Sequence, residues 1–494
     1  RNAILSSNAQ GQNSLGAEQQ PCIRIDTERC WKITSAIADP VPWKVMAVKA
    51  GLHAFPEHRQ VEPLKYTTVG HNLLPILKRV LPYLREAEVV RSLGPAYLTK
   101  VPSICLSSSY FSGAEWKNNV LDIATGFLAQ QKDFLPDQDE IIVPYKENIA
   151  RIELRKLSLA RLSREKDADE LCKEVQSLIA TCKRRSKRSN VWYGEMLLFH
   201  SRLLVDMEEF DEALKVLSQF KPLDAENISW LEHIQRNDVE FLKGEINRYK
   251  GDFHQSLAIF KDLLNQQPTP PKVITHMPAV LSECGHYDKA LNILQDDLER
   301  IERKKSTTGR RLALALAETQ LMKATSMRMN GQSISDINSL IYDAESLLRE
   351  HENCSQQPEN LTYVGKITRF RFLLASAIGK HLTEKEDEAI SCWERVQSAS
   401  GELWPEGYTN MIIAYALSDL YFRQRKMEQS EKMDDVVITL RGGLNPDNRP
   451  KVKRSFYFLM FGTLWPRYLD TMKSSHGREP LLNYDELVYN TLPR

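Results

Sequence analysis

Apolar residues recur at three- and four-residue intervals along most of the chain from about residue 30 onward. The segments HNLLPILKRVLPYL at 71–84 and ENIARIELRKLSLARL at 147–162 both show this spacing. Such a period places apolar side chains on one face of a helix. Alternation with a period of two, which is typical of a half-buried strand, is nearly absent. We therefore predict an all-α fold.

A short frame of residues recurs where the predicted helices end. It reads GDFHQSL at 251–257 and GHYDKAL at 285–291, and the step from Gly251 to Gly285 is 34 residues. The frame has glycine in the first place, an aromatic residue in the third and a small residue in the sixth. Looser copies, with a charged residue in the first place, lie at 208–214, 384–390 and 425–431. A fixed step of this length is typical of stacked helical hairpins.

Each place in the frame has an expected physical role. The first residue ends the first helix of a hairpin, where a left-handed backbone is easiest without a Cβ atom. The next residue, Asp252 in the best copy, is expected to cap the second helix. Small residues let the two helices approach closely, and we expect these to be Ala213, Ser256, Ala290, Ala389 and Ser430. Bulky residues one turn later are expected to fill the contact with the next hairpin, and these are Phe260, Leu294 and Trp393.

This arrangement resembles the tetratricopeptide repeat (TPR), a helical hairpin that stacks into a superhelix. The resemblance is strongest at 237–270 and continues through 271–304. The matching positions in the first of these segments are Gly244, Gly251, Phe253, Ser256, Phe260 and Pro268. The segment 304–360 departs from the pattern, because it is longer than one repeat. The resemblance implies a TPR-like α-solenoid.

The pattern divides the chain into five expected segments. Residues 1–25 are polar and are expected to form a disordered leader or linker. We expect an N-terminal helical region with degenerate repeats at 26–190, regular TPR-like repeats at 191–304, longer and divergent helical pairs at 305–445, and a C-terminal capping helix and tail at 446–494.

Composition narrows the functional classes. The 494 residues include 66 Lys and Arg against 65 Asp and Glu, so no global field favours nucleic acid or a membrane surface. Only 21 residues are glycine, which is few for a large α/β enzyme. The eight cysteines form no CxxC pair and indicate free thiols in a reducing, cytoplasmic compartment. The longest apolar run, at 456–465, is about half of the ~20 residues that span a membrane.

Motifs that carry chemistry are missing from the sequence. We find no P-loop, HExxH, GxSxG, EF-hand loop or zinc-spaced Cys/His set, and we expect no cofactor, no metal and no catalytic residue. An enzyme or enzyme subunit with a site at 30–180 stays open, because SICLSSSYFSGAEW at 103–116 gathers Cys105 and Ser107. A nucleophile of either type needs a neighbouring base. The alternative is a polar loop before a helix that starts at Ser112 or Gly113.

The dense basic run KRRSKR, Lys183–Arg188, raises a third hypothesis, a nuclear regulatory scaffold imported through this run. The alternative is a solvated loop, since the preceding stretch EKDADELCKE is acidic. No aromatic residues alternate with the basic ones to stack on bases, so nucleic acid is disfavoured as a partner.

A second resemblance involves the segment 43–81. It is similar to the region that joins the ATPase-linked part to the repeats in fungal STAND proteins, which are signalling NTPases of NACHT or NB-ARC type. The matching pieces are Ala54-Phe55-Pro56 and Leu73-Leu74-Pro75, with Ile76 in place of the usual histidine. The chain begins at Arg1 rather than methionine. The resemblance implies a piece of a larger signalling protein whose nucleotide-binding domain lies upstream.

The repeat resemblance implies a non-enzymatic scaffold or sensor that binds a protein or peptide in a concave groove, with no membrane partner and with a homo-oligomer left open. In this frame, alternate turns of each first helix line the groove. The expected residues are Arg202, Asp238, Phe241, Glu245, Arg248, Lys272, Arg371, Tyr415 and Asp419. Arg202 and Arg248 are the strongest of these, because arginine forms bidentate bonds with acidic groups. The alternative for each residue is a solvated surface position.

Overall fold

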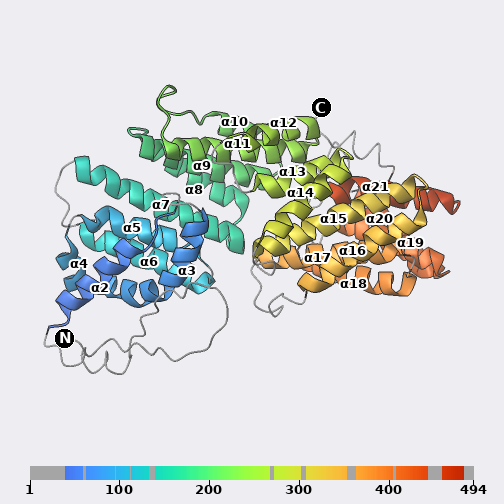
Figure 1. The fold of residues 1–494 in the computed structure, drawn as a ribbon, viewed down its shortest axis with the longest axis horizontal. Coiled ribbons are helices and arrows are strands. Elements are labelled where there is room, and N and C mark those ends of the chain that lie inside the picture. Colours follow the sequence, from blue (N-terminus) through green and yellow to red (C-terminus); the bar gives the residue numbers. More distant parts are fainter. Residues whose placement is uncertain are drawn as a thin grey trace. The chain divides into compact units, whose positions relative to one another are not determined.

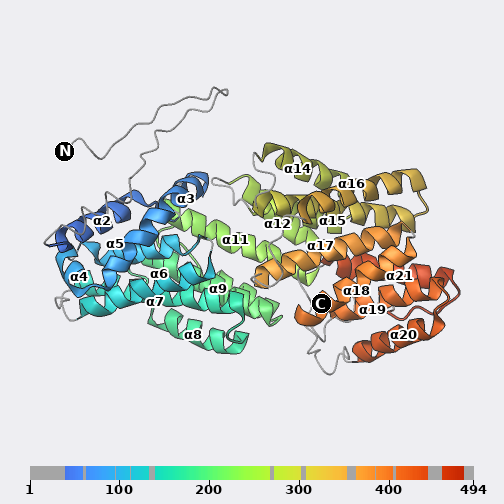
Figure 2. The ribbon, with the colours of Figure 1, turned by 90° about the horizontal axis from the view of Figure 1, so that it is seen from below.

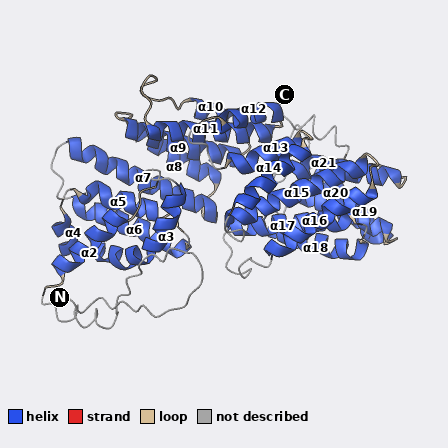
Figure 3. Ribbon diagram, viewed as in Figure 1, coloured by secondary structure: helices blue, strands red, loops and turns tan. Residues whose placement is uncertain are grey.

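All regular structure in the part of the chain described here is helical (Figure 3). The computed structural model describes residues 39–58, 63–94, 96–111, 113–132, 139–266, 272–301, 307–352, 363–383, 385–403, 408–442 and 459–482. The predicted all-α fold is confirmed over these residues. The leader expected at 1–25 lies outside them. None of the helices in these ranges combines the length and apolarity needed to cross a membrane.

The chain forms two compact units, Arg1–Lys156 and Leu157–Arg494. Helix α7 (Asp139–Ser163) passes from the first unit into the second. The five-segment division of the sequence stays a prediction.

Unit 1 packs α-helices of 7 to 18 residues around a core of aliphatic and aromatic side chains. Its helices before α7 are α2 (Val41–Ala54), α3 (Pro63–Val80), the 3-10 helix η1 (Leu81–Arg85), α4 (Ala87–Leu93), α5 (Tyr97–Ser108) and α6 (Ala114–Gln131). Helix α2 packs against α3 and α4, and α5 packs against α6 (Figure 1). Leu52, Leu81 and Ile104 are fully buried between them. Apolar burial of this kind is the main force that holds short helices together.

Unit 2 consists of helices that follow one another in pairs. They are α8 (Ala168–Thr181), α9 (Lys187–Asp206), α10 (Phe210–Ser218), α11 (Trp230–Lys250), α12 (Phe253–Leu264), α13 (Val273–Glu283), α14 (Tyr287–Arg300), α15 (Thr307–Met329), α16 (Ile334–Glu352), α17 (Tyr363–Leu382), α18 (Glu386–Leu403), α19 (Tyr408–Arg423), α20 (Met427–Gly442) and α21 (Leu459–Ser475).

Each odd-numbered helix from α9 to α19 packs against the helix that follows it. We call the odd-numbered members, α9 to α19, the first helices and their partners, α10 to α20, the second helices. The first helices α9, α11, α13, α15 and α17 also pack side by side in chain order. Figure 2 shows α15, α17 and α18 lying next to one another. Neighbouring pairs thus share a face made of first helices.

The repeat frame marks the turns between paired helices. Gly251 and Gly285, which stand in the first place, have φ angles of 88° and 78°. Glu208 and Arg425 stand in the same place and also have positive φ, 66° and 59°. In these four copies the second helix begins two residues later, and Glu384, the first place of the fifth copy, lies outside the described residues. The predicted left-handed cap is therefore confirmed at glycine and non-glycine residues alike.

The small residues of the frame lie in the contact between the paired helices. The five expected ones are buried, and these are Ala213, Ser256, Ala290, Ala389 and Ser430. The Ser256 hydroxyl donates a hydrogen bond to the Gly244 carbonyl at 2.8 Å, and Ser430 repeats this bond with the Ser418 carbonyl at 3.0 Å. Phe260 is fully buried against Gly244, where an added Cβ would lie 2.5 Å from the ring. Gly244 is thus a close-packing point.

The expectation that Asp252 caps its helix is wrong. Asp252 stands at the N-cap of α12, but its side chain makes no capping hydrogen bond and its ψ is 60°. Side-chain caps need the extended backbone that Ser229 has before α11, where ψ is 155° and a capping box forms with Glu232. The backbone closes the turn at Asp252 instead, since its N–H donates to the Asn247 carbonyl at 2.9 Å.

Candidate partner-binding face

Charged side chains from neighbouring first helices of unit 2 meet on one side of these helices. We call this surface the first-helix face, and it comprises Arg202 on α9, Asp238, Glu245 and Arg248 on α11, and Lys272 and His276 at the start of α13.

Contacts between α11 and α13 hold the middle of this face. His276 Nδ1 lies 3.2 Å from Glu245 Oε1, and Arg248 forms a longer ion pair of 3.8 Å with Glu283. The Lys272 ammonium lies over the Phe241 ring, 5.8 Å from its centroid. A cation over an aromatic ring is attracted by the electron-rich ring face. Residues far apart in sequence are thus fixed close together.

The charges of several helices act on one another here. The pKa of Lys272 lies below its ordinary value, because nearby protein desolvates the ammonium and because Arg202 adds positive charge, although the residue keeps an exposed surface. Asp238 and Glu245 oppose this effect. Desolvation lowers the pKa of His276 to about 4, and the positive charges of Arg248 and Lys272 add to the effect.

Arg371 of α17, another predicted groove residue, contacts the first helix α15. Its Nε donates to Glu318 Oε1 at 2.9 Å and its second nitrogen donates to the other carboxylate oxygen, a bidentate pair between α17 and α15. Arg371 also lies near enough to lower the pKa of Arg311 on α15, for which desolvation is the larger cause.

The structure separates the sequence-predicted groove residues into two sets. Six keep accessible surface, and these are Arg202, Asp238, Glu245, Arg248, Lys272 and Arg371. Phe241, Tyr415 and Asp419 are buried, with 1–2% exposure. Phe241 packs under Lys272 and beside His276, with ring centroids 4.9 Å apart. Burial removes these three side chains from direct contact with a partner.

The repeat frame did not predict two residues that lie among these charged side chains, Arg311 and His276. Arg311 lies in the segment that departs from the repeat length, so the frame gave it no position. His276 follows Lys272 by four residues, a spacing that places two helical residues on the same face. That spacing was the one available signal for His276.

The C-terminal helix α21 explains the burial of Tyr415 and Asp419. Helix α21 packs against α15 and α19. Tyr415 donates a hydrogen bond to Asp470 at 2.6 Å and accepts one from the Leu481 N–H at 3.2 Å. The predicted groove side of α19 is therefore covered by the chain's own C-terminal helix and the residues after it.

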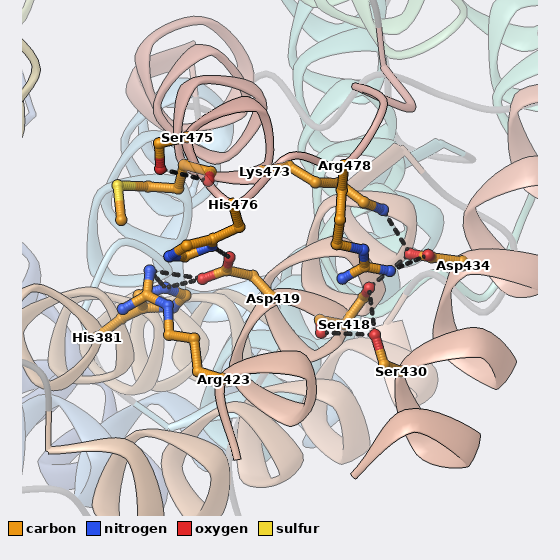
Figure 4. Close-up of polar contacts among 11 residues, drawn as sticks. His381, Ser418, Asp419, Arg423, Ser430, Asp434, Lys473, Ser475, His476 and Arg478 are labelled. Atoms are coloured by element: carbon orange, nitrogen blue, oxygen red, sulfur yellow. Dashed lines mark hydrogen bonds and ion pairs between the residues drawn. The ribbon is translucent and has the colours of Figure 1, made fainter. Parts of the chain in front are cut away.

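A cluster of paired charges lies where α21 meets α17, α19 and α20 (Figure 4). Asp419 lies 3.1 Å from His381 Nε2 and 2.6 Å from Arg423, with His476 at 3.8 Å. Desolvation alone would raise the pKa of Asp419, but the His381 hydrogen bond and the nearby positive charges hold it below its ordinary value. Removing one member would leave a buried charge without its partner.

A second carboxylate in the cluster, Asp434 of α20, binds both Lys473 and Arg478, at 2.8 and 2.5 Å. Ser418 also donates to Asp434 at 2.5 Å. Figure 4 shows the two carboxylates on neighbouring helices, each turned toward residues of the C-terminal segment. These contacts join α21 to the hairpin of α19 and α20.

The polar loop expected at 103–116 as the alternative to an enzyme site is wrong for its first part, because residues 103–108 belong to helix α5. The helix expected to start at Ser112 or Gly113 is α6, for which Gly113 is the N-cap residue. The Ser107 hydroxyl donates to the Ser103 carbonyl at 2.8 Å and accepts the His58 backbone N–H at 2.9 Å. Within the described ranges, no imidazole nitrogen or carboxylate hydrogen bonds with this hydroxyl. Burial raises the pKa of Cys105 to about 12, which disfavours a thiolate.

Two other candidate features are a metal site and the basic run at 183–188. Among the residues that the structure describes, no group of three His, Cys, Asp or Glu side chains is arranged to hold a metal ion. Part of the basic run 183–188 has local structural contacts, because Arg184 donates to the Lys221 carbonyl at 2.8 Å and lies over the Tyr193 ring.

Comparison with models of protein families and with curated proteins gives no match. The two family resemblances therefore stand on the residues of this chain alone.

Proposed function

We propose that this protein is a non-enzymatic interaction module, a TPR-like α-solenoid whose first-helix face binds a protein or peptide. The observation that carries the proposal is the meeting of charged side chains from α9, α11 and α13 on one accessible face. We extend it to a scaffold or sensor role in a larger cytoplasmic signalling protein, on the strength of the resemblance to fungal STAND proteins.

The repeat features of unit 2 support the array. Left-handed turns recur at four equivalent places, and the contact between paired helices recurs with the same small residues. The buried core of α9 to α15 runs in successive clusters, from Leu197–Ile246 through Phe241–Ala290 to Leu291–Leu316, whereas the cluster that follows, from Leu314 to Leu482, also joins α15 to the distant helix α21. Contacts limited to neighbours in sequence are typical of stacked repeats, which often present an extended binding surface.

Side-chain chemistry supports binding rather than catalysis. The first-helix face offers arginine, lysine and carboxylate groups that can pair with a partner's polar groups. Neither the serine-rich helix α5 nor the paired charges under α21 offers a nucleophile beside an open base.

A peptide-selection experiment tests this function. Random dodecapeptides displayed on phage are selected on the full chain, and the selected peptides are then added to chains that carry a photo-crosslinking amino acid. One chain carries it at Thr275 on the first helix α13, and the other at Lys289, an exposed residue on the second helix α14. We expect crosslinks at Thr275 and few at Lys289.

Crosslinks at Lys289 with none at Thr275 would contradict the first-helix face as the binding surface. Release of phosphate from ATP by this purified chain would contradict the non-enzymatic assignment.

A further inference from the structure

Helix α21 covers a part of unit 2 that the repeat frame assigned to a partner. It packs against the first helices α15 and α19. Its Trp465 meets His381 of the first helix α17 edge-on, with ring centroids 5.2 Å apart. Helix α20 ends at Gly442 and α21 begins at Leu459, so α21 is not continuous with the hairpin that it covers. The chain's own C-terminal helix thus lies across three first helices.

One stripe of α21 makes this contact. Its members are each at most 2% exposed, and they are Trp465, Tyr468, Leu469 and Lys473. The spacing i, i+3, i+4 and i+8 is that of an amphipathic helix, and such helices are a common form of ligand in apolar grooves. A lysine in this stripe is unusual, because burying an ammonium is costly unless it is paired.

The surface under α21 contains a carboxylate that pairs with this lysine. Asp434 of α20 lies 2.8 Å from Lys473 and 2.5 Å from Arg478, and Figure 4 shows both cations reaching it from the C-terminal segment. Among the described residues, no other cation lies within 4.0 Å of Asp434. A helix that replaces α21 must therefore bring positive charge to this place, because a partly buried carboxylate without a partner is costly.

The contact also leaves buried polar atoms without hydrogen bonds. Within the described part of the chain, Trp465 Nε1, His381 Nδ1 and Arg478 Nη1 have no hydrogen-bond partner. An unsatisfied buried donor or acceptor is destabilising, and a buried ion pair offsets its own desolvation only in part. Helix α21 is thus an imperfect match to its surface, and a helix that satisfies these atoms binds there more tightly.

We propose that the surface of α15, α17 and α19 under α21, with Asp434 at its edge, is a second partner-binding surface that α21 occupies as an intramolecular competitor. The partner is an amphipathic helix of another protein, with a tryptophan and, eight residues later, a basic residue that pairs with Asp434. This inference goes beyond the proposed function, because the first-helix face lies on α9, α11 and α13.

Binding of the detached helix to the full chain tests the inference. The probe is a fluorescein-labelled peptide with the sequence of residues 459–482. Fluorescence anisotropy follows its titration with the unaltered chain and with K473Q/R478Q, whose own helix cannot pair with Asp434. We expect the double variant to bind the probe at least about tenfold more tightly, because the attached helix competes at high effective concentration only while its ion pairs are intact.

Two further variants test the role of the carboxylate. D434N/K473Q/R478Q keeps the weakened helix and removes the acidic group, so we expect it to bind the probe at least about fivefold more weakly than K473Q/R478Q. R478Q alone keeps the Lys473 pair, and we expect a gain of about threefold over the unaltered chain. This milder variant serves as the test if K473Q/R478Q does not fold.

The matched control is R425Q/K432Q, which removes an exposed arginine and an exposed lysine from the turn before α20 and from α20 itself. It should bind the probe as the unaltered chain does. Circular dichroism identifies the variants that are folded. Probe binding to folded K473Q/R478Q or R478Q that is no tighter than to the unaltered chain would overturn the inference.

A second copy of this chain is the alternative occupant. If sedimentation shows that the unaltered chain is a dimer and that K473Q/R478Q is a monomer, α21 binds a neighbouring copy and the inference is overturned. The proposed interaction function is tested separately. Peptides that crosslink at Thr275 support the first-helix face even if the probe shows no gain in K473Q/R478Q.

Discussion

At the residue scale, the turn between paired helices requires a left-handed backbone at its first residue, whether that residue is glycine or not. Gly251 and Gly285 meet this requirement without strain, whereas Glu208 and Arg425 adopt φ angles of 66° and 59°. A Cβ atom in the left-handed region costs roughly 1 kcal/mol relative to glycine. The position was predictable from the repeat frame, because its backbone requirement is local.

We expect Arg425→Gly to stabilise the protein by about 1 kcal/mol. Arg425 is exposed and begins the turn before α20, so removing its side chain disturbs no core contact. Urea unfolding followed by circular dichroism measures the change. Arg425→Ala is the control and should give no comparable gain, because alanine keeps the Cβ atom. Equal stabilisation by both would show that φ is not the cause.

The partly buried, desolvated imidazole of His276 makes stability depend on pH. Its folded pKa of about 4 lies below the unfolded value of about 6.5, so the unfolded chain takes up a proton first as pH falls. The stabilising contribution is therefore complete above about pH 6.5 and is lost as pH falls toward 4.

We expect His276→Gln to reduce the loss of unfolding free energy between about pH 7 and 4.5. The side chain keeps 28% exposure, so solvent reduces the effect of the pKa difference on stability. We therefore expect the variant to lose about 1–2 kcal/mol less unfolding free energy than the unaltered chain over this pH range. Denaturant titrations at both pH values measure it. The exposed His254, replaced by Gln, is the control. The same pH dependence in His276→Gln and the unaltered chain would disprove this role.

At the element scale, helix pairs were predictable where apolar period and turn signals coincide, as at α11–α12 and α13–α14. The position of α21 was not. The sequence predicted a capping helix within 446–494, but its partners are distant in the chain, as Tyr415 and Asp470 are separated by 55 positions. No local pattern specifies such a pairing, and this is why Tyr415 and Asp419 were expected on an open groove.

Trp465 is the main apolar contact of α21. Its ring stacks on Tyr468 at 4.9 Å and on Trp393 at 6.0 Å, and His381 meets it edge-on at 5.2 Å. We expect Trp465→Ala to destabilise unit 2 by about 3–5 kcal/mol, through lost burial and the cavity left behind.

Thermal and urea unfolding measure the effect of Trp465→Ala. Trp230→Ala is the size-matched control, because Trp230 is 57% exposed and should change stability by less than about 0.5 kcal/mol. Similar small effects of both substitutions would contradict the packing role of α21.

At the scale of the whole molecule, the first-helix face belongs entirely to unit 2. Helix α8 has its own N-terminal cap, since the Asp167 side chain accepts the Glu170 N–H at 2.8 Å. Residue 167 is thus a natural start for a fragment that contains the face.

We expect the fragment 167–494 to bind a peptide selected on the full chain within about threefold of the full chain's affinity, because every residue assigned to binding is retained. Anisotropy titration gives the affinity, and circular dichroism verifies that the fragment is folded. A folded fragment that has lost binding would show that residues before position 167 supply part of the site.

Hydrogen exchange, with and without a selected peptide, tests the central claim most directly. Backbone amides exchange more slowly where a ligand stabilises the local structure. Binding on the first-helix face predicts slower exchange in α9, α11 and α13 and little change in α10, α12 and α14. Protection confined to those second helices, or to unit 1, would contradict the account.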